Sequence, residues 1–153
     1  MLDRLITGAR VFDGRHFLDN TNVGMREGVV SYVGRECPET KVVTNGCDRI
    51  LSPSFIDSHT HADFHCFDPG NDGHSAISQG VTTLVVGNCG MSATPVCQVN
   101  PLLIPNDHDH NLDLEQHAQR LQGELPLDVA DLIGHGTLRI SVMGALVKQS
   151  SDQ

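Results

Sequence analysis

Basic side chains and long apolar segments are scarce in this sequence of 153 residues. Lysine and arginine number 10 against 19 aspartates and glutamates, and the formal net charge is −9. An acidic surface repels phosphate backbones, so a nucleic-acid partner is not expected. No apolar run reaches the roughly 18 residues that cross a bilayer, and the first residues lack the pattern of a secretory signal. We therefore expect a cytoplasmic protein with neither a nucleic-acid nor a membrane partner.

The composition also disfavours disulfides and disorder. The five cysteines are odd in number and scattered along the chain, which argues against a disulfide framework. Hydrophobic residues make up 39% and charged residues 19%, a balance typical of a folded globular chain. Histidine, by contrast, is abundant, with nine residues, several of them close together in the middle of the chain. Because histidine is the commonest metal ligand, their placement directs attention to metal binding.

The first 52 residues predict a small β module. Asp13-Gly14 is a strong hairpin-turn pattern when strands flank it. Four or five strands at about ten-residue spacing are indicated by apolar or β-branched stretches at 5–12, 28–33, 41–44 and 50–51.

From Pro53 onward the sequence predicts alternating strands and helices. The run VTTLVV at 81–86 is nearly continuous in β-branched residues, as in strands buried on both faces of a parallel sheet. Such an alternation is typical of βαβ units. The expected order is a strand at 55–57, a helix at 71–79, a strand at 81–86, a loop at 97–110, a helix at 113–122 and a strand at 129–133.

The pair His59 and His61 is the sharpest chemical feature of the sequence. Residues i and i+2 of a strand point to the same face, so both imidazoles would project from the carboxyl end of the strand at 55–57. Cys89 follows the next predicted strand and would reach the same edge, where a thiolate is a strong zinc ligand. The alternatives are a pair of polar loop histidines and a small buried cysteine.

Three ordered motifs resemble one enzyme family. The segment PSFIDSHTHAD at 53–63 resembles the first barrel strand of the amidohydrolase superfamily. The segments QGVTTLVVGNCGMS at 79–92 and LIGHGTLR at 132–139 are similar to a narrower group, the N-acyl-D-amino-acid deacylase (D-aminoacylase) family. The opening ITGARVFDG at 6–14 is similar to the N-terminal β-sandwich of that family.

The resemblance implies an α/β fold with an N-terminal β module and a metal centre. Residues 1–52 would form a partial β-sandwich, and 53–147 the first βα units, with three strands, of a TIM barrel. His59, His61 and Cys89 would be metal ligands, with Cys89 able to bridge two ions, and zinc is expected as one or two ions.

The implied activity is metal-dependent hydrolysis of linear amide bonds, most specifically the deacylation of N-acyl-D-amino acids. The substrate partner would be a small N-acyl amino acid, and the oligomeric state is not indicated. Asp63 would contact the metal ligands without binding the metal itself.

The resemblance also implies an incomplete barrel. A full (β/α)8 barrel takes about 250 residues, and at about 30 residues per βα unit the chain after residue 52 has room for three. Two further histidine ligands and a catalytic aspartate would lie beyond Met143, so no residue here is assigned a catalytic role. Residues 148–153 are expected to be a disordered tail after a premature stop or frameshift, which puts the activity of the chain in doubt.

The sequence leaves two other functions open. One is a non-catalytic remnant that binds a metal through His59, His61 and Cys89. The other is a cyclic-amide hydrolase of the dihydroorotase or hydantoinase type, which Cys89 disfavours because those enzymes usually bridge their metals with a carboxylated lysine.

Outside the three motifs, the remaining histidines are expected to lie in loops or on the surface. His16 and His117 are predicted to be surface residues. His65 with Cys66, and a second histidine pair at 107–110, are predicted to be loop residues without a ligand role.

Overall fold

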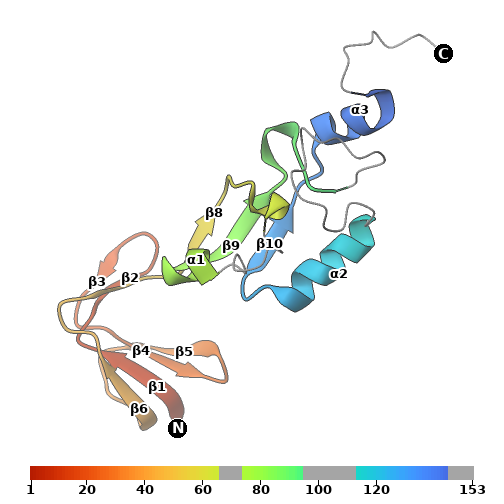
Figure 1. Cartoon of the computed structure of the whole chain (residues 1–153). Helices are drawn as coiled ribbons and strands as arrows, with labels where there is room; N and C mark the ends of the chain where they lie inside the picture. The colour runs from red at the N-terminus through yellow and green to blue at the C-terminus, as the bar shows by residue number, and fades with distance from the viewer. Residues whose placement is uncertain (66–73, 95–112, 145–153) are drawn as a thin grey trace. The chain divides into compact units, whose positions relative to one another are not determined.

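The computed structural model describes residues 1–65, 74–94 and 113–144, which belong to two compact units. The first unit is Met1–Pro53 and the second begins at Ser54 (Figure 1). Each unit is built around its own sheets, mixed in the first and parallel in the second. The α/β architecture with an N-terminal β module is therefore present.

The first unit contains one four-stranded and one three-stranded sheet. In the larger sheet β1 pairs with β4 in antiparallel and with β6 in parallel register. The larger sheet has the order β5-β4-β1-β6, with β1 at Leu2–Thr7, β4 at Asn22–Arg26, β5 at Val29–Gly34 and β6 at Thr40–Asn45. The smaller sheet has the order β3-β2-β7, with β2 at Arg10–Phe12, β3 at Phe17–Leu18 and β7 at Ile50–Leu51.

The hairpin predicted at Asp13-Gly14 is confirmed by the pairing of β2 with β3. Oδ1 of Asp13 accepts hydrogen bonds from the backbone N–H groups of Arg15 and His16, both at 2.7 Å. The backbone N–H of Asp13 donates to the carbonyl of His16 at 3.1 Å. An aspartate that bonds its own turn in this way mimics a backbone turn and fixes where the two strands meet.

Strand β4 was not expected from the sequence because its five residues include a glycine and only one β-branched residue, Val23. Glycine weakens a strand interior and lowers its apparent propensity. In the folded unit, however, a Cβ at Gly24 would overlap the side chain of Leu2 on the neighbouring strand. A side chain at position 24 would therefore displace the side chain of Leu2 on β1, a constraint that only the sheet reveals.

The second unit is a three-stranded parallel sheet with helices between its strands. Its order is β10-β9-β8, and β9 pairs in parallel with both neighbours. The strands are β8 at Phe55–Asp57, β9 at Val81–Val86 and β10 at Asp128–Asp131. The helices are α1 at His74–Ser78, α2 at Leu114–Glu124 and α3 at His135–Met143, with short 3-10 turns η1 at Ala62–Phe64 and η2 at Asn88–Gly90. None of the described helices is long and apolar enough to cross a membrane.

The predicted order of strands and helices is confirmed, with two corrections near the end of the described chain. Strand β10 ends at Asp131 rather than at residue 133, and Leu132 and Ile133 are exposed. Helix α3 was not predicted, because Gly136 and the β-branched Thr137 give its first turn a low helix propensity. The expected loop at 97–110, with its histidine pair, Cys66 and the tail at 148–153 lie outside the described residues.

Helix α2 begins where its sequence predicts and runs slightly further. The side chain of Asp113 accepts a hydrogen bond from the backbone N–H of Gln116, whose side chain in turn accepts from the N–H of Asp113. This capping box satisfies two backbone donors that a helix N-terminus leaves open. The helix continues to Glu124, past the end expected at Gly123.

The core of the second unit lies against β9, its central strand. Leu84, Val86 and Leu127 are buried there. The partly buried hydrophobic residues packed against them are Ala62, Ala76, Val81, Leu125 and Val129. Residues from η1, α1, β9 and β10 thus share one apolar cluster, in which Leu84 and Val86 of β9 are buried while the other residues of the strand are partly buried.

His117 is buried, and its prediction as a surface residue was wrong. Its side chain on α2 is 3% exposed, and its Nε2 lies 3.5 Å from Oδ2 of Asp131 on β10. Burial lowers the pKa of His117, against an opposing effect of the Asp63 carboxylate, and burial raises the pKa of Asp131. Desolvation therefore favours the neutral form of both side chains.

Replacement of His117 by glutamine should flatten the acid side of the stability profile. The folded chain holds the pKa of His117 below its ordinary value of 6.5, so the unfolded chain binds the proton first as the pH falls. The contribution of neutral His117 to the free energy of unfolding is therefore complete above pH 6.5. It is lost as the pH falls toward the folded pKa, by up to about 1.4 kcal/mol per pH unit. Urea unfolding of both proteins between pH 7 and pH 5 measures this, and equal slopes for wild type and H117Q would contradict it.

Truncation of the core at Leu84 should destabilise the second unit. Leu84→Ala leaves a cavity beside Val86 and Leu127, with an expected loss of about 2–5 kcal/mol in the free energy of unfolding. The matched control is Val142→Ala on α3, whose side chain is 75% exposed, and which should change the value by no more than about 0.5 kcal/mol. Urea unfolding followed by far-UV circular dichroism compares the two, and equal stabilities would show that this cluster is not the core.

Candidate metal centre

The two histidines of the candidate site follow directly after β8. Oδ1 of Asp57, the last residue of that strand, accepts a hydrogen bond from the backbone N–H of His59 at 3.1 Å. The N–H of Thr60 donates to the carbonyl of Val85 on β9 at 3.2 Å. The segment His59–His61 is therefore tied to the carboxyl end of the parallel sheet.

Cys89 lies in the turn that follows β9. Gly87 has a φ of 74°, and a Cβ there would collide with the carbonyl of Leu132, so no other residue is accommodated. The side-chain amide of Asn88 donates to the carbonyl of Val85 at 2.7 Å and to that of Thr60 at 3.4 Å. Asn88 thereby joins the turn carrying Cys89 to the segment carrying the histidines.

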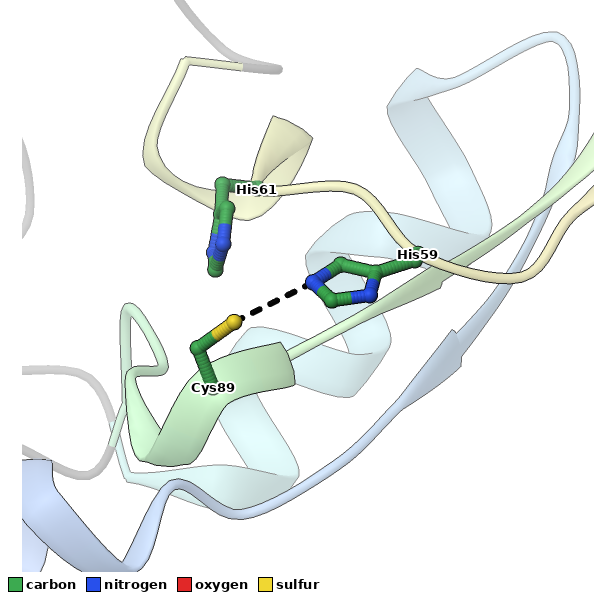
Figure 2. A group of neighbouring side chains, drawn as sticks. All are labelled: His59, His61 and Cys89. Carbon is green, nitrogen blue, oxygen red and sulfur yellow. Dashed lines mark hydrogen bonds between the residues drawn. The ribbon is translucent and has the colours of Figure 1, made fainter.

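The structure brings His59, His61 and Cys89 together (Figure 2). Nε2 of His59 lies 3.1 Å from Sγ of Cys89, and the two imidazole rings are 5.8 Å apart in an edge-to-face arrangement. One ligand atom from each residue lies within 4.8 Å of the other two. His59 and Cys89 are exposed and His61 is half-buried, so solvent reaches the cluster.

The three side chains have the chemistry that a zinc-class ion requires, and their ligand atoms lie within 4.8 Å of one another. Zinc takes imidazole nitrogen at about 2.0–2.1 Å and thiolate sulfur at about 2.3 Å, so the ligands of one ion lie within roughly 4 Å of one another. Nδ1 of His61 is buried with no hydrogen-bond partner among the residues described. A buried ring nitrogen without a hydrogen-bond partner costs free energy unless a bound group satisfies it.

Asp63, expected to stand behind the ligands, lies two residues beyond His61 in η1 and is 4% exposed. Its Oδ2 accepts a hydrogen bond from the backbone N–H of Ala93 at 2.8 Å. Burial raises the pKa of this carboxyl, opposed by the bond from Ala93, while the nearby charge of Asp131 raises it further. Asp63 thus links the histidine segment to the chain that follows Cys89.

Two hydroxyl residues near the cluster were missed in the sequence. Ser92 and Thr137 are each 1% exposed and hydrogen-bond to each other across 45 positions. Serine and threonine are common in turns and at helix ends, so neither carries a pattern that singles it out. The other histidines described near the chain's middle or in its first unit, His65 and His16, are exposed and stand outside the ligand group.

Several known proteins similar to this chain are D-aminoacylases or N-acyl-D-amino-acid deacylases. A D-aminoacylase of Alcaligenes xylosoxydans xylosoxydans is 32% identical over 99% of this chain and 33% of its own length. The crystal structure of a D-aminoacylase that defines a subset of amidohydrolases matches with a TM-score of 0.82 and 29% identity, over 99% of this chain and 33% of that one. No family model matches the sequence.

A third relative is an N-acyl-D-glutamate deacylase from Bordetella bronchiseptica, solved with zinc and a phosphonate inhibitor that mimics the tetrahedral intermediate. It matches with a TM-score of 0.76 and 31% identity, over 93% of this chain and 31% of its own. The chain spans about a third of the length of the relatives it matches. It is related along its length to the N-terminal portion of the D-aminoacylases and N-acyl-D-amino-acid deacylases of the amidohydrolase superfamily.

Proposed function

We propose that this chain supplies the first metal ligands of an N-acyl-D-amino-acid deacylase. The convergence of His59, His61 and Cys89 at the carboxyl edge of a parallel sheet is the observation that carries the proposal. Zinc, as one or two ions, is the proposed metal, because imidazole and thiolate together favour it. The zinc held by the Bordetella bronchiseptica relative supports that choice.

The proposed substrate is a small N-acyl-D-amino acid. A bound zinc ion supplies an activated water at neutral pH and polarises the acyl carbonyl. For this, His59 and His61 must present neutral imidazoles and Cys89 must present a thiolate. The exposure of His59 and Cys89 leaves room for a substrate to reach them. None of the described residues is given the role of general base in this proposal.

We further propose that the second unit, from residue 53 to 147, forms the first βα units of a TIM barrel and that residues 1–52 form part of a β-sandwich. The strands β8, β9 and β10 lie side by side in chain order, all parallel, as in a barrel. The ligands lie at the carboxyl ends of β8 and β9, the end at which barrel enzymes build their active sites.

Asp63 is proposed to position the histidine segment rather than to bind the metal. Oδ2 of its carboxylate accepts the backbone N–H of Ala93, and the side chain is buried two residues beyond His61. Carboxylates behind metal ligands orient those ligands and are costly to remove.

A cytoplasmic location completes the proposal. Cys37, Cys47 and Cys89 are exposed free thiols. Exposed free thiols are compatible with a reducing compartment, where disulfides are rare.

Two other functions share parts of this site. A non-catalytic protein that only binds a metal would use the same three ligands. It would differ from the proposed deacylase only in having no hydrolytic activity. A cyclic-amide hydrolase is disfavoured, because Cys89 would be the bridging ligand here and those enzymes usually bridge their metals with a carboxylated lysine.

Removal of the thiol ligand should weaken metal binding strongly. We expect Cys89→Ser to lower the affinity for Zn²⁺ by at least about 100-fold, since changes even to outer partners cost 10–100-fold. The matched control is Cys47→Ser, an exposed cysteine of the first unit, which should leave the affinity unchanged. Competition with a chromophoric chelator measures both, and equal affinities for C89S and C47S would exclude Cys89 as a ligand.

Hydrolysis is the test that separates the proposed activity from simple metal binding. We expect zinc-loaded protein that carries this chain to release free D-methionine from N-acetyl-D-methionine and not from the L-enantiomer. The C89S variant should lose the activity, and addition of a chelator should abolish it. Zinc binding through the three ligands without amine release would favour the non-catalytic, metal-binding alternative.

A further inference from the structure

The ligand Cys89 has a backbone conformation that costs free energy. Its φ of 57° and ψ of 20° place it in the left-handed region, which residues other than glycine seldom adopt. Such a conformation persists only where the surrounding structure enforces it, and it is often found at functional sites. The residues that enforce it at Cys89 therefore decide where the thiol points.

On one side the turn is held by Asn88, whose amide reaches the carbonyls of Val85 and Thr60. On the other side the chain continues through Gly90 and Met91 into Ser92, which is buried. A turn held at both ends has less freedom to change its φ and ψ angles than a turn held at one end, so the contacts of Ser92 matter for the orientation of Cys89.

The second hold is a set of hydrogen bonds between Ser92 and the first turn of α3. Oγ1 of Thr137 accepts from the backbone N–H of Ser92 at 2.8 Å and donates to the carbonyl of the same residue at 3.1 Å. Oγ of Ser92 accepts from the N–H of Gly134 at 3.0 Å and donates to the carbonyl of Thr94 at 2.6 Å. We refer to these bonds as the Ser92–Thr137 junction.

Backbone packing brings the junction close to the ligand turn. A Cβ at Gly134 or at Gly136 would lie 2.7 Å from the carbonyl oxygen of Gly90, the residue directly after Cys89. The start of α3 therefore rests against the ligand turn with no side chain between them. Any shift of α3 would press on the peptide next to Cys89.

We propose that Thr137 and Ser92 are positioning residues that hold the Cys89 thiol in its metal-binding orientation. This inference rests on the proposed function, in which Cys89 is a ligand. The hydroxyl of Thr137 serves both the N–H and the carbonyl of Ser92, so its loss leaves two buried backbone groups without partners. The backbone from Gly90 to Ser92 then moves to regain them.

The histidine ligands provide an internal reference for this effect. His59 and His61 belong to the segment after β8 and are held by Asp57 and Val85, not by α3. Disruption of the junction should therefore weaken the bond from sulfur to metal while the nitrogen ligands remain. A general loss of folding would weaken all three together.

The test uses Co²⁺ as the probe, because thiolate ligation gives a charge-transfer band that nitrogen ligation does not. We compare Thr137→Val with Thr94→Val in the 153-residue chain. Thr94 is also buried, at 5% exposure, but its Oγ1 has no hydrogen-bond partner within the described part of the chain. The two variants therefore remove the same atom, and only one of them breaks the junction.

We expect T137V to lose most of the charge-transfer intensity per bound Co²⁺ and about ten-fold in affinity. T94V and the conservative Thr137→Ser should retain both. Equal spectra for T137V and T94V would overturn the proposal. If the wild-type chain shows no band that C89S removes, the proposed metal centre itself fails, which is a separate result.

A second variant covers the case in which T137V does not fold, as judged by far-UV circular dichroism. Ser92→Ala removes only the bonds from Oγ to Gly134 and Thr94 and keeps both backbone bonds to Thr137. A weaker charge-transfer band in S92A than in T94V supports the junction as a positioning device. An unchanged band in folded S92A overturns it.

Discussion

The parallel pairing of β8 with β9 is the constraint on which the candidate site depends. Both strands end at the same edge of the sheet. The hydrogen bond from the N–H of Thr60 to the carbonyl of Val85 connects the two segments again beyond the end of β8. This pairing brings Nε2 of His59 to 3.1 Å from Sγ of Cys89, although the two residues are 30 positions apart in sequence. Strand β9 lies between two parallel neighbours, and its residues Leu84 and Val86 belong to the buried core, so pairing on both sides fixes the end of the strand from which Cys89 follows.

Beneath the ligands the structure uses buried polar groups where apolar packing alone would not fix a direction. Asp63 takes the N–H of Ala93, and Thr137 takes both backbone groups of Ser92. Two consecutive residues after the ligand turn, Ser92 and Ala93, are thus held by side chains from two other elements. Hydrogen bonds are directional, so they specify the orientation of a loop more closely than a contact between hydrophobic surfaces does.

The first unit shows how far local patterns lead and where they stop. The hairpin at Asp13-Gly14 was predicted from the Asp-Gly pair, and in the structure the aspartate side chain bonds its own turn, which needs only neighbouring residues. Strand β4 was missed because the glycine within it is explained by the side chain of Leu2, a residue far away in sequence. The prediction failed where the cause was a tertiary contact.

The sequence by itself determined the order of strands and helices in the second unit, the start of α2 at Asp113, and the candidate ligands His59, His61 and Cys89. Strand alternation, capping and turn chemistry act over a few residues, so a short window contains their cause. Only the tertiary structure decided that His117 is buried, that α3 forms after Gly134, and that Thr137 joins Ser92. The burial of a polar side chain depends on partners from distant segments, and no local pattern specifies which partner arrives.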